Sequence, residues 1–293
     1  MDQYQPGKSK NAITVDVEDY FHVSAFESRI SRSDWNRYPL RVETNTRHIM
    51  DVFDEFNTKG TFFVLGWVAE KCRDLVLEIQ ERGHEVGCHG YAHELIYRIG
   101  PDRFRQDIHK ARTLLEDICG KKIAGYRAPS FSITERSLWA LDILLEEGFL
   151  YDSSIFPIRH DLYGMRNAEL FPHRVTREKG AIMEFPLSIF RVKFFRKTVH
   201  LPIAGGGYLR LLPLWLLKHG IDHINRVERQ PAVLYFHPWE LDPRQPRVKS
   251  SLKSRIRHYQ NLEKTEGKIR NLIAAFRFAP MGDVLGVHPL DAE

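Results

Sequence analysis

Short apolar runs alternate with amphipathic helical stretches along most of this chain, and this alternation is the feature that most restricts its fold. The strand-like runs cover residues 12–17, 61–66, 84–90, 122–129, 181–187, 232–238 and 282–287. Helical periodicity covers residues 44–57, 67–82, 101–119, 134–147, 212–227 and 250–276, whereas 158–210 is the least regular stretch. Strands and helices that alternate so regularly predict a parallel α/β sheet or barrel.

Length and composition are typical of a globular protein. The 293 residues are 43% hydrophobic and 28% charged, which allows a packed core. No run approaches 18 apolar residues, and the polar first ten residues lack the apolar core of a secretory signal. The three cysteines, Cys72, Cys88 and Cys119, are too few and too widely spaced for a disulfide framework. We therefore expect a soluble, cytoplasmic protein.

Positive charge is concentrated near the C-terminus. Residues 243–277 contain ten Lys or Arg against two acids and carry +8, which leaves −3 for the rest of a chain whose net charge is +5. A solvated basic helical surface is the simplest interpretation. An anionic partner, such as a membrane surface or a phosphate-linked glycan carrier, is the alternative, and peripheral contact with the inner membrane would follow from it. Nucleic acid is not expected, because no recognised binding motif accompanies the charge.

Four clusters of polar residues follow predicted strands at their C-terminal ends. They are the acids of "TVDVEDYF" (14–21), the histidines of "HGYAH" (89–93), Arg127 of "YRAP" (126–129) and His237 of "FHPWE" (236–240). In parallel α/β folds the loops after the strands converge at this edge, and ligands and catalysis gather there. We therefore expect these four clusters to form one site.

The residue types in these clusters are those of a metal-assisted hydrolase. His89 and His93 are four residues apart, so both imidazoles reach one ion if the segment turns helically. Two histidines and one carboxylate would leave open positions for water and substrate, and they suit zinc, with cobalt and iron as alternatives. The simpler interpretation is a pair of polar loop histidines.

The remaining polar residues suggest proton transfer. One of the three acids in "DVED" (16–19) can bind the ion while another accepts a proton from water. Arg127 is expected to pair with the second acid and to keep it ionised, although a purely structural ion pair is the alternative. His237 ends a very apolar strand before Pro238, and an imidazole facing a pocket there suits a general acid.

The order of these motifs resembles the polysaccharide deacetylases of the NodB homology type, carbohydrate esterase family four, over residues 10–240. The stretches "TVDVEDYFHVSAFE", "GYRAPSFSIT", "YDSSIFP", "GGGY" and "RFAPMGDVLG" resemble the subgroup encoded beside exosortase (PEP-CTERM) and exopolysaccharide loci. The resemblance implies a distorted (β/α) barrel of about seven strands. It also implies a NodB-like catalytic domain over 10–240 and a basic helical C-terminal extension, 241–293, that packs on the barrel.

The resemblance further implies metal-dependent removal of N-acetyl groups from an N-acetylated polysaccharide or a lipid-linked oligosaccharide. Asp16 would be the general base, Arg127 would orient it, and His237 would be the general acid. One divalent ion would be held by His89, His93 and a carboxylate. A backbone N–H near Ser130 would stabilise the oxyanion, and Tyr235 would line the acetyl pocket.

Several positions depart from the family's usual pattern. Adjacent aspartates are usual where this chain reads "TVDVED", so the third metal ligand is either Glu18 or Asp19. In a different alignment of these acids, Glu18 would be the base. Gly90 stands where Ser or Thr is usual, Ser130 replaces an aromatic residue, and Tyr235 replaces a leucine. These departures affect the prediction of the acceptor sugar more than the prediction of the reaction.

Three other functions fit parts of the sequence. An allantoinase-like cyclic amide or formamide hydrolase would share the fold and differ in its product. A two-histidine, one-carboxylate iron oxygenase would share the ligand types, but such enzymes have a β-rich fold. A non-catalytic glycan-binding protein would bind without releasing acetate, although the full set of acid, base and ligands favours an enzyme.

Overall fold

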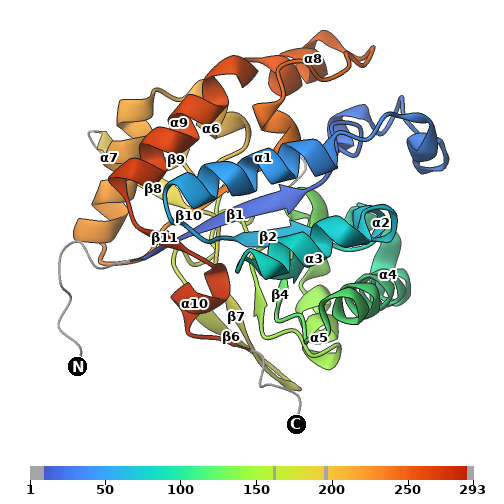
Figure 1. Ribbon diagram of the computed structural model, residues 1–293. Helices are drawn as coiled ribbons and strands as arrows, with labels where there is room; N and C mark the ends of the chain where they lie inside the picture. Colours follow the sequence, from blue (N-terminus) through green and yellow to red (C-terminus); the bar gives the residue numbers. More distant parts are fainter. Residues whose placement is uncertain (1–9, 161–162, 195–196, 289–293) are drawn as a thin grey trace.

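Parallel strands form the centre of the structure, which the computed structural model describes for residues 10–160, 163–194 and 197–288 (Figure 1). Seven strands run parallel in the order β10–β1–β2–β3–β4–β5–β7, while β6 pairs antiparallel with β7 and β11 pairs with β1. The strands of this sheet are β1 (Asn11–Val17), β2 (Thr61–Val64), β3 (Glu85–Cys88), β4 (Gly125–Tyr126), β5 (Tyr151–Asp152), β6 (His173–Arg177), β7 (Gly180–Glu184), β10 (Val233–Phe236) and β11 (Phe278–Ala279). The predicted α/β class is confirmed.

The two ends of the row of parallel strands approach each other through irregular segments. Within the described residues, no ladder joins β7 directly to β10. Instead, Leu187 N–H donates to the Ile155 carbonyl, Ile203 N–H to the Ser188 carbonyl, and Tyr235 N–H to the Ala204 carbonyl. No ladder in the described part of the chain closes the sheet into a complete barrel, and segments 185–188 and 203–206 stand where further strands of such a barrel would lie. A separate hairpin, β8 (Ile189–Phe194) and β9 (Lys197–Pro202), lies between these segments.

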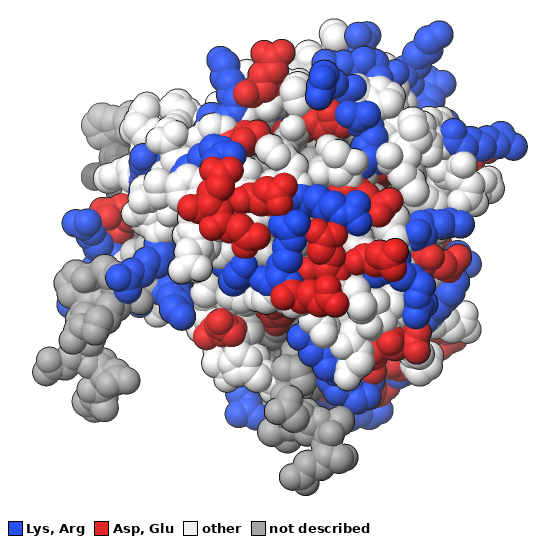
Figure 2. Space-filling view, in the orientation of Figure 1, with Lys and Arg blue, Asp and Glu red and all other residues white. Residues whose placement is uncertain are grey.

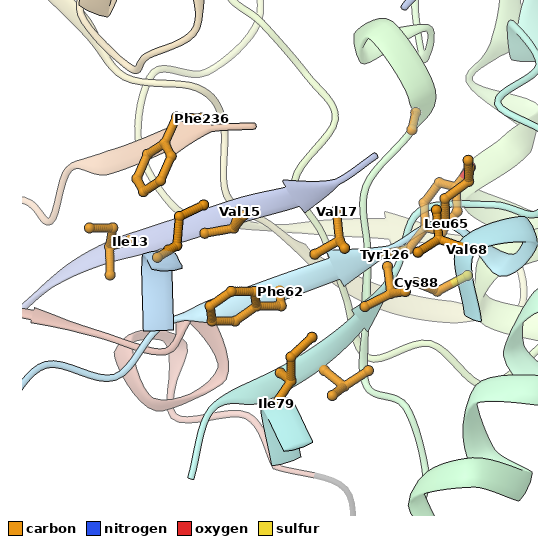
Figure 3. Packing of buried hydrophobic residues seen from close by; sticks show 14 of the residues in the cluster. Ile13, Val15, Val17, Phe62, Leu65, Val68, Ile79, Cys88, Tyr126 and Phe236 are labelled. Carbon is orange, nitrogen blue, oxygen red and sulfur yellow. The ribbon is translucent and has the colours of Figure 1, made fainter. Parts of the chain in front are cut away.

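Alternate residues of the strands divide between two cores. Ile13, Val15 and Val17 of β1 point toward the covering helices together with Phe62 of β2 (Figure 3). Ala12 belongs to the second cluster, which fills the inside of the curved sheet. Because successive side chains of a strand point to opposite faces, Thr14 and Asp16 share the inner face with Ala12. The first carboxylate is thus directed into the barrel by the register of an otherwise apolar strand.

Helices cover the outer face of the sheet. Helices α1, α3 and α4 lie along strands β1 to β4 in Figure 1, and α9 lies beside α1. The helices are α1 (Val42–Glu55), α2 (Gly66–Lys71), α3 (Arg73–Glu81), α4 (Ile96–Cys119), α5 (Trp139–Glu146), α6 (Gly207–Leu211), α7 (Leu214–Arg226), α8 (Leu252–Tyr259), α9 (Leu262–Ala275) and α10 (Met281–Leu285). Short 3₁₀ turns include η1 (Ser24–Phe26), η3 (Pro129–Phe131), η4 (Glu135–Ser137) and η5 (Pro238–Leu241).

Acidic and basic side chains alternate on the helical face that Figure 2 shows. Arg82 of the α3 end pairs with Asp51 and Glu78, and Arg270 of α9 pairs with Glu55. Each exposed pair contributes little to stability, about 0–1 kcal/mol. This face is therefore a solvated surface that carries several ion pairs.

Two of the predicted elements near the C-terminus are wrong in detail. The expected helix over 250–276 is broken at Asn261, whose φ is +57°, into α8 and α9. The carbonyls of Arg257 and His258, which a continuous helix would use itself, accept hydrogen bonds from Arg210. The strand-like run 282–287 lies largely in helix α10, which begins after Pro280 and ends at Gly286, where φ is +66°.

The C-terminal segment packs closely on the sheet. Strand β11 pairs with Asn11 and Ala12 of β1, and the N–H groups of Met281 and Gly282 donate to the side chains of Thr61 and Glu85. The boundary at 240/241 stays a prediction, and residues 289–293 and the first nine residues, on which the signal-peptide prediction rests, lie outside the described residues. Among the described helices, none is long and apolar enough to cross a bilayer.

Candidate active site

Glu18 and Asp19, the two acids after β1, point in different directions. Both carboxylate oxygens of Asp19 accept backbone hydrogen bonds, Oδ2 from Arg41 and Val42 at 2.7 and 2.9 Å and Oδ1 from Tyr20 at 2.9 Å. Arg41 is the N-cap and Val42 the first residue of α1, and the free N–H groups at this helix end favour a carboxylate. Asp19 therefore caps a helix. Glu18 instead turns toward the histidines.

Glu18, His89 and His93 form a buried group suited to a cation. One ligand atom from each of the three side chains lies within 4.8 Å of the other two. His93 Nε2 is 2.7 Å from Glu18 Oε2, yet that oxygen has no aligned hydrogen-bond donor. A buried carboxylate oxygen without a donor is costly unless a cation satisfies it. Two imidazoles and one carboxylate oxygen are the ligand set of many divalent-metal sites, so the residues fit such an ion.

The loop that carries the histidines is not the helical turn that the spacing suggests. His89 follows β3, and His93 has a left-handed φ of +50°, so the expectation of a helical i, i+4 pair is wrong. His89 Nδ1 lies 2.8 Å from the Arg127 carbonyl, an acceptor that directs Nε2 toward the ion site. Asp107 of α4 accepts hydrogen bonds from Tyr91 and Ala92 N–H and so fixes the loop between the histidines.

Asp16 and Arg127 form a buried ion pair beside this group. Arg127 Nη1 lies 2.8 Å from Asp16 Oδ1 and 2.6 Å from Thr14 Oγ1. The guanidinium also donates to the carbonyl and hydroxyl of Ser153, at 3.0 and 2.9 Å. Arg127 is fully buried and its donors reach partners from β1 and from the segment after β5. Asp16 Oδ1 is thereby held in place while Oδ2 faces His237.

His237 faces the same space from the end of β10. Its Nε2 lies 3.9 Å from Asp16 Oδ2 and 3.6 Å from Glu18 Oε1. Its Nδ1 lies 2.7 Å from Glu240 Oε1, and Glu240 Oε2 accepts a hydrogen bond of 2.6 Å from Arg210 Nε. This series of hydrogen bonds, from Arg210 through Glu240 to Nδ1, holds the imidazole with Nε2 directed at the site. Trp239 stacks on the ring at a centroid distance of 5.0 Å.

The electrostatics of the site favour charged forms at two positions. Burial would raise the pKa of Glu18, but the neighbouring imidazoles of His93, His237 and His89 outweigh it and hold this pKa well below its usual value. Burial would lower the pKa of His237, but Glu240 and Glu18 outweigh it and raise this pKa to about 9. Glu18 is therefore an anion and His237 a cation able to give up a proton.

Ser130 and Tyr235 are the two remaining residues that were predicted for the site. Ser130 has a left-handed φ of +51° in η3, and its hydroxyl lies 2.7 Å from that of Ser24. Its N–H belongs to the first turn of that helix, where N–H groups have no acceptor within the helix. Tyr235 is buried with its ring 4.9 Å from that of Phe131 and 5.9 Å from that of His237. The structure thus brings the predicted site residues together around Glu18 and His237, except Ser130, which is linked to them only through its neighbour Phe131, and Asp19, which turns to α1.

Sequence reasoning missed the residues that hold the others in place. Glu240 and Arg210 fix His237, Ser153 holds Arg127, and Asp107 supports the histidine loop. Only Glu240 had a local signal, since it lies three residues after His237 in "FHPWE". The others come from distant segments and depend on the tertiary fold.

The arrangement supplies the parts of an amide hydrolysis. Asp16 Oδ2 can accept a proton, His237 Nε2 can donate one, and the two atoms are 3.9 Å apart. The group of Glu18, His89 and His93 adjoins both of them and can hold a divalent cation.

Comparison with known proteins assigns the two halves of the chain differently. Residues 34–144 match the polysaccharide deacetylase family model, and residues 153–286 match a model described as a domain of unknown function, DUF3473. A peptidoglycan-N-acetylglucosamine deacetylase of Bacillus cereus is 35% identical over 98 residues, which are 33% of this chain and 36% of that protein. The chain thus spans little more than a third of this relative's length.

Solved structures share the fold over nearly the whole chain. A putative polysaccharide deacetylase from Mycobacterium smegmatis has a TM-score of 0.61 and 20% identity, with 99% of this chain and 96% of that chain covered. The PuuE allantoinase has a TM-score of 0.58 and 15% identity, with 97% and 91% covered. At these identities the likeness extends to the fold alone.

Proposed function

We propose that the chain, of which residues 34–144 match the polysaccharide deacetylase family model, is a metal-dependent hydrolase that removes N-acetyl groups from a bacterial exopolysaccharide or its lipid-linked precursor. The observation that carries this proposal is the buried group of Glu18, His89 and His93 beside the Asp16–Arg127 pair and His237. A general base, a general acid and a cation site adjoin one another in the fold in which deacetylases occur.

The residues divide the reaction as follows. A divalent ion held by Glu18, His89 and His93 would supply Lewis-acid polarisation of the acetamide carbonyl. Asp16 accepts the proton of the attacking water, and Arg127 holds Asp16 Oδ1 so that Oδ2 stays free for this proton. His237 Nε2 then protonates the departing sugar amine, while Glu240 holds the ring from Nδ1. The Ser130 N–H would stabilise the negative oxygen.

The proposed polymer follows from the sequence resemblance. The motifs "TVDVEDYFHVSAFE" and "GYRAPSFSIT" resemble those of deacetylases encoded beside exosortase and exopolysaccharide loci. Residues 153–286, which match a different family model from the first half, contribute Ser153, Arg210, Tyr235, His237 and Glu240 to the site. The substrate is therefore expected to differ from that of the peptidoglycan deacetylase relative.

Acetate release tests the proposal. The purified protein should release acetate from N-acetylglucosamine oligomers, and Asp16→Asn or His89→Ala should lower the rate about 100-fold or more. A chelator should abolish the activity, and one divalent ion per chain should restore it. Arg226→Gln, on the outer face of α7, is the matched control and should behave as the parent.

The outcomes separate this function from its alternatives. Full acetate release by both Asp16→Asn and His89→Ala would contradict the assignment of the site. Ring opening of a cyclic amide without acetate release would indicate an allantoinase-like activity. Binding of oligomers without any product would indicate a glycan-binding protein.

A further inference from the structure

Two adjoining hollows outside the catalytic group share a wall formed by Ile158, Arg159 and Arg166. Their volumes are about 500 and 320 Å³. The larger is lined also by Arg136, His160 and Tyr163, and the smaller by His200 and Tyr208. We call the two hollows together the arginine groove. None of the roles described for the site uses its arginines.

The groove has an excess of positive charge. Arg136, Arg159 and Arg166 are exposed, and none of them forms an ion pair with a residue in the described part of the chain. Glu135 is the only carboxylate among the described lining residues. Burial raises the pKa of both Tyr163 and Tyr208, and the cation of Arg257, on the basic helix α8, opposes this rise at each. Arg257 therefore adds a fourth positive charge near the groove.

A continuous series of aromatic rings joins the groove to the general acid. His160 stacks on Tyr163 at a centroid distance of 3.9 Å, and Tyr163 contacts Phe131 at 6.0 Å. Phe131 contacts Tyr235 at 4.9 Å, and Tyr235 contacts His237 at 5.9 Å. Phe131 and Tyr235 are buried, so these rings are not themselves a surface for the glycan, but they show that the groove and His237 border the same aromatic cluster, within reach of one oligosaccharide.

We propose that the arginine groove binds an acidic sugar unit, bearing a carboxylate or a phosphate, in the same glycan whose acetamide is hydrolysed at Asp16 and His237. This inference rests on the proposed function and adds the charge class of the substrate. Guanidinium groups match the two oxygens of a carboxylate or phosphate, which would explain three arginines that form no ion pair within the described residues. The stacked rings of His160 and Tyr163 offer a flat face to a sugar ring.

The test compares substrates that differ only in charge. We expect kcat/KM for acetate release to be about tenfold higher on alternating N-acetylglucosamine–glucuronate oligomers than on neutral N-acetylglucosamine oligomers of equal length, because exposed ion pairs contribute modestly. A phosphorylated N-acetylglucosamine oligomer forms a second arm, so that the carboxylate and phosphate sources are distinguished. The preference should diminish at 0.5 M salt.

Substitutions in the arginine groove test whether it causes the preference for acidic oligomers. The triple variant Arg136→Gln, Arg159→Gln and Arg166→Gln should reduce the ratio of acidic to neutral kcat/KM to near one. Arg73→Gln, Arg174→Gln and Arg226→Gln, which remove the same charge from positions lining neither hollow, should keep the ratio. Thermal unfolding should be compared for both triple variants.

A ratio near one in the parent protein, or an unchanged ratio in the groove variant, would overturn the inference. Binding of the de-N-acetylated acidic oligomer, measured by calorimetry, tests the groove even if no acetate is released from any oligomer. Binding that the groove variant abolishes would support the inference in that case, and equal binding by the two triple variants would contradict it.

Discussion

At the scale of single residues, neighbouring carboxylates have unlike roles because their oxygens meet unlike partners. Glu18 Oε2 lies against His93 without a donor, whereas the oxygens of Asp19 accept three backbone N–H groups. Burial also raises the pKa of Asp19 to about 6, which a structural cap tolerates. The charge of Asp19 is used locally, and that of Glu18 is available to an ion.

Glu18→Gln and Asp19→Ala should therefore fail in different ways. Glu18→Gln is expected to lose the bound divalent ion and acetate release while it unfolds at nearly the parent temperature. Asp19→Ala should keep the ion and lose about 1–2 kcal/mol of stability, because the cap of α1 is removed. Metal content and thermal unfolding of both proteins check this. Loss of the ion in Asp19→Ala alone would reverse the assignment.

At the same scale, the burial of His84 makes the free energy of unfolding sensitive to acid. Burial lowers its pKa to about 4, and its Nδ1 accepts the Gly60 N–H. The unfolded chain takes up a proton near pH 6.5 and the folded chain only near pH 4, so stability is full above pH 6.5 and falls as the pH drops between these values. The loss amounts to at most about 3 kcal/mol.

His84→Asn keeps an acceptor for Gly60 and removes the titration. Its free energy of unfolding should depend less steeply on pH between 6.5 and 4 than that of the parent. Denaturant unfolding at several pH values measures this slope. Parallel pH curves for the two proteins would show that another group causes the acid sensitivity.

At the scale of elements, the turn from β10 into η5 joins the general acid to the C-terminal helices. Glu240 bonds His237 with one oxygen and Arg210 with the other. Arg210, on α6, donates also to the carbonyls of Arg257 and His258 in the last turn of α8 and of Gln260 just after it. The break between α8 and α9, which periodicity did not predict, leaves those carbonyls free for the guanidinium.

Glu240→Gln should lower kcat about 10- to 100-fold with little change in KM, because the amide keeps the shape but loses the charge that holds the imidazole. Glu240→Asp is the partner variant and should recover part of the rate, since the charge is retained. Acetate release kinetics and the unfolding temperature are the measurements. Equal losses in both variants would contradict the prediction, because retention of the charge would then recover none of the rate.

At the scale of the whole molecule, the basic C-terminal segment belongs to the same packed unit as the sheet. Strand β11 extends the sheet beside β1, and Leu272 and Ile269 of α9 lie in the core cluster that also contains Val15. Figure 1 shows α9 lying along α1 rather than apart from it. We therefore expect both the stability of the whole chain and the activity of the site to depend on this segment.

Leu272→Ala should lower the free energy of unfolding of the whole chain by about 2–5 kcal/mol, because a buried leucine is truncated. A single unfolding transition is expected, with loss of helix signal and loss of acetate release at the same temperature. Leu252→Ala, at an exposed position on α8, is the control and should change stability little. Two separate transitions would instead support an independent domain after residue 240.

The sequence by itself determined the α/β class, the parallel strands and the strand ends at which the functional residues gather. It did so because strand and helix periods and the residues after each strand are local features, readable without contacts. Asp16, Arg127 and His237 were recognised on this basis, and the structure places them together.

Only the tertiary structure decided which acid faces the histidines and what holds each side chain. The direction of Glu18 and Asp19 depends on where the N-terminus of α1 lies, and the histidine spacing is set by a loop fixed from α4. Glu240, Arg210 and Ser153 act across segments far apart in the chain. Periodicity specifies faces of elements, whereas hydrogen bonds between elements fix individual atoms, and those depend on packing that no local pattern contains.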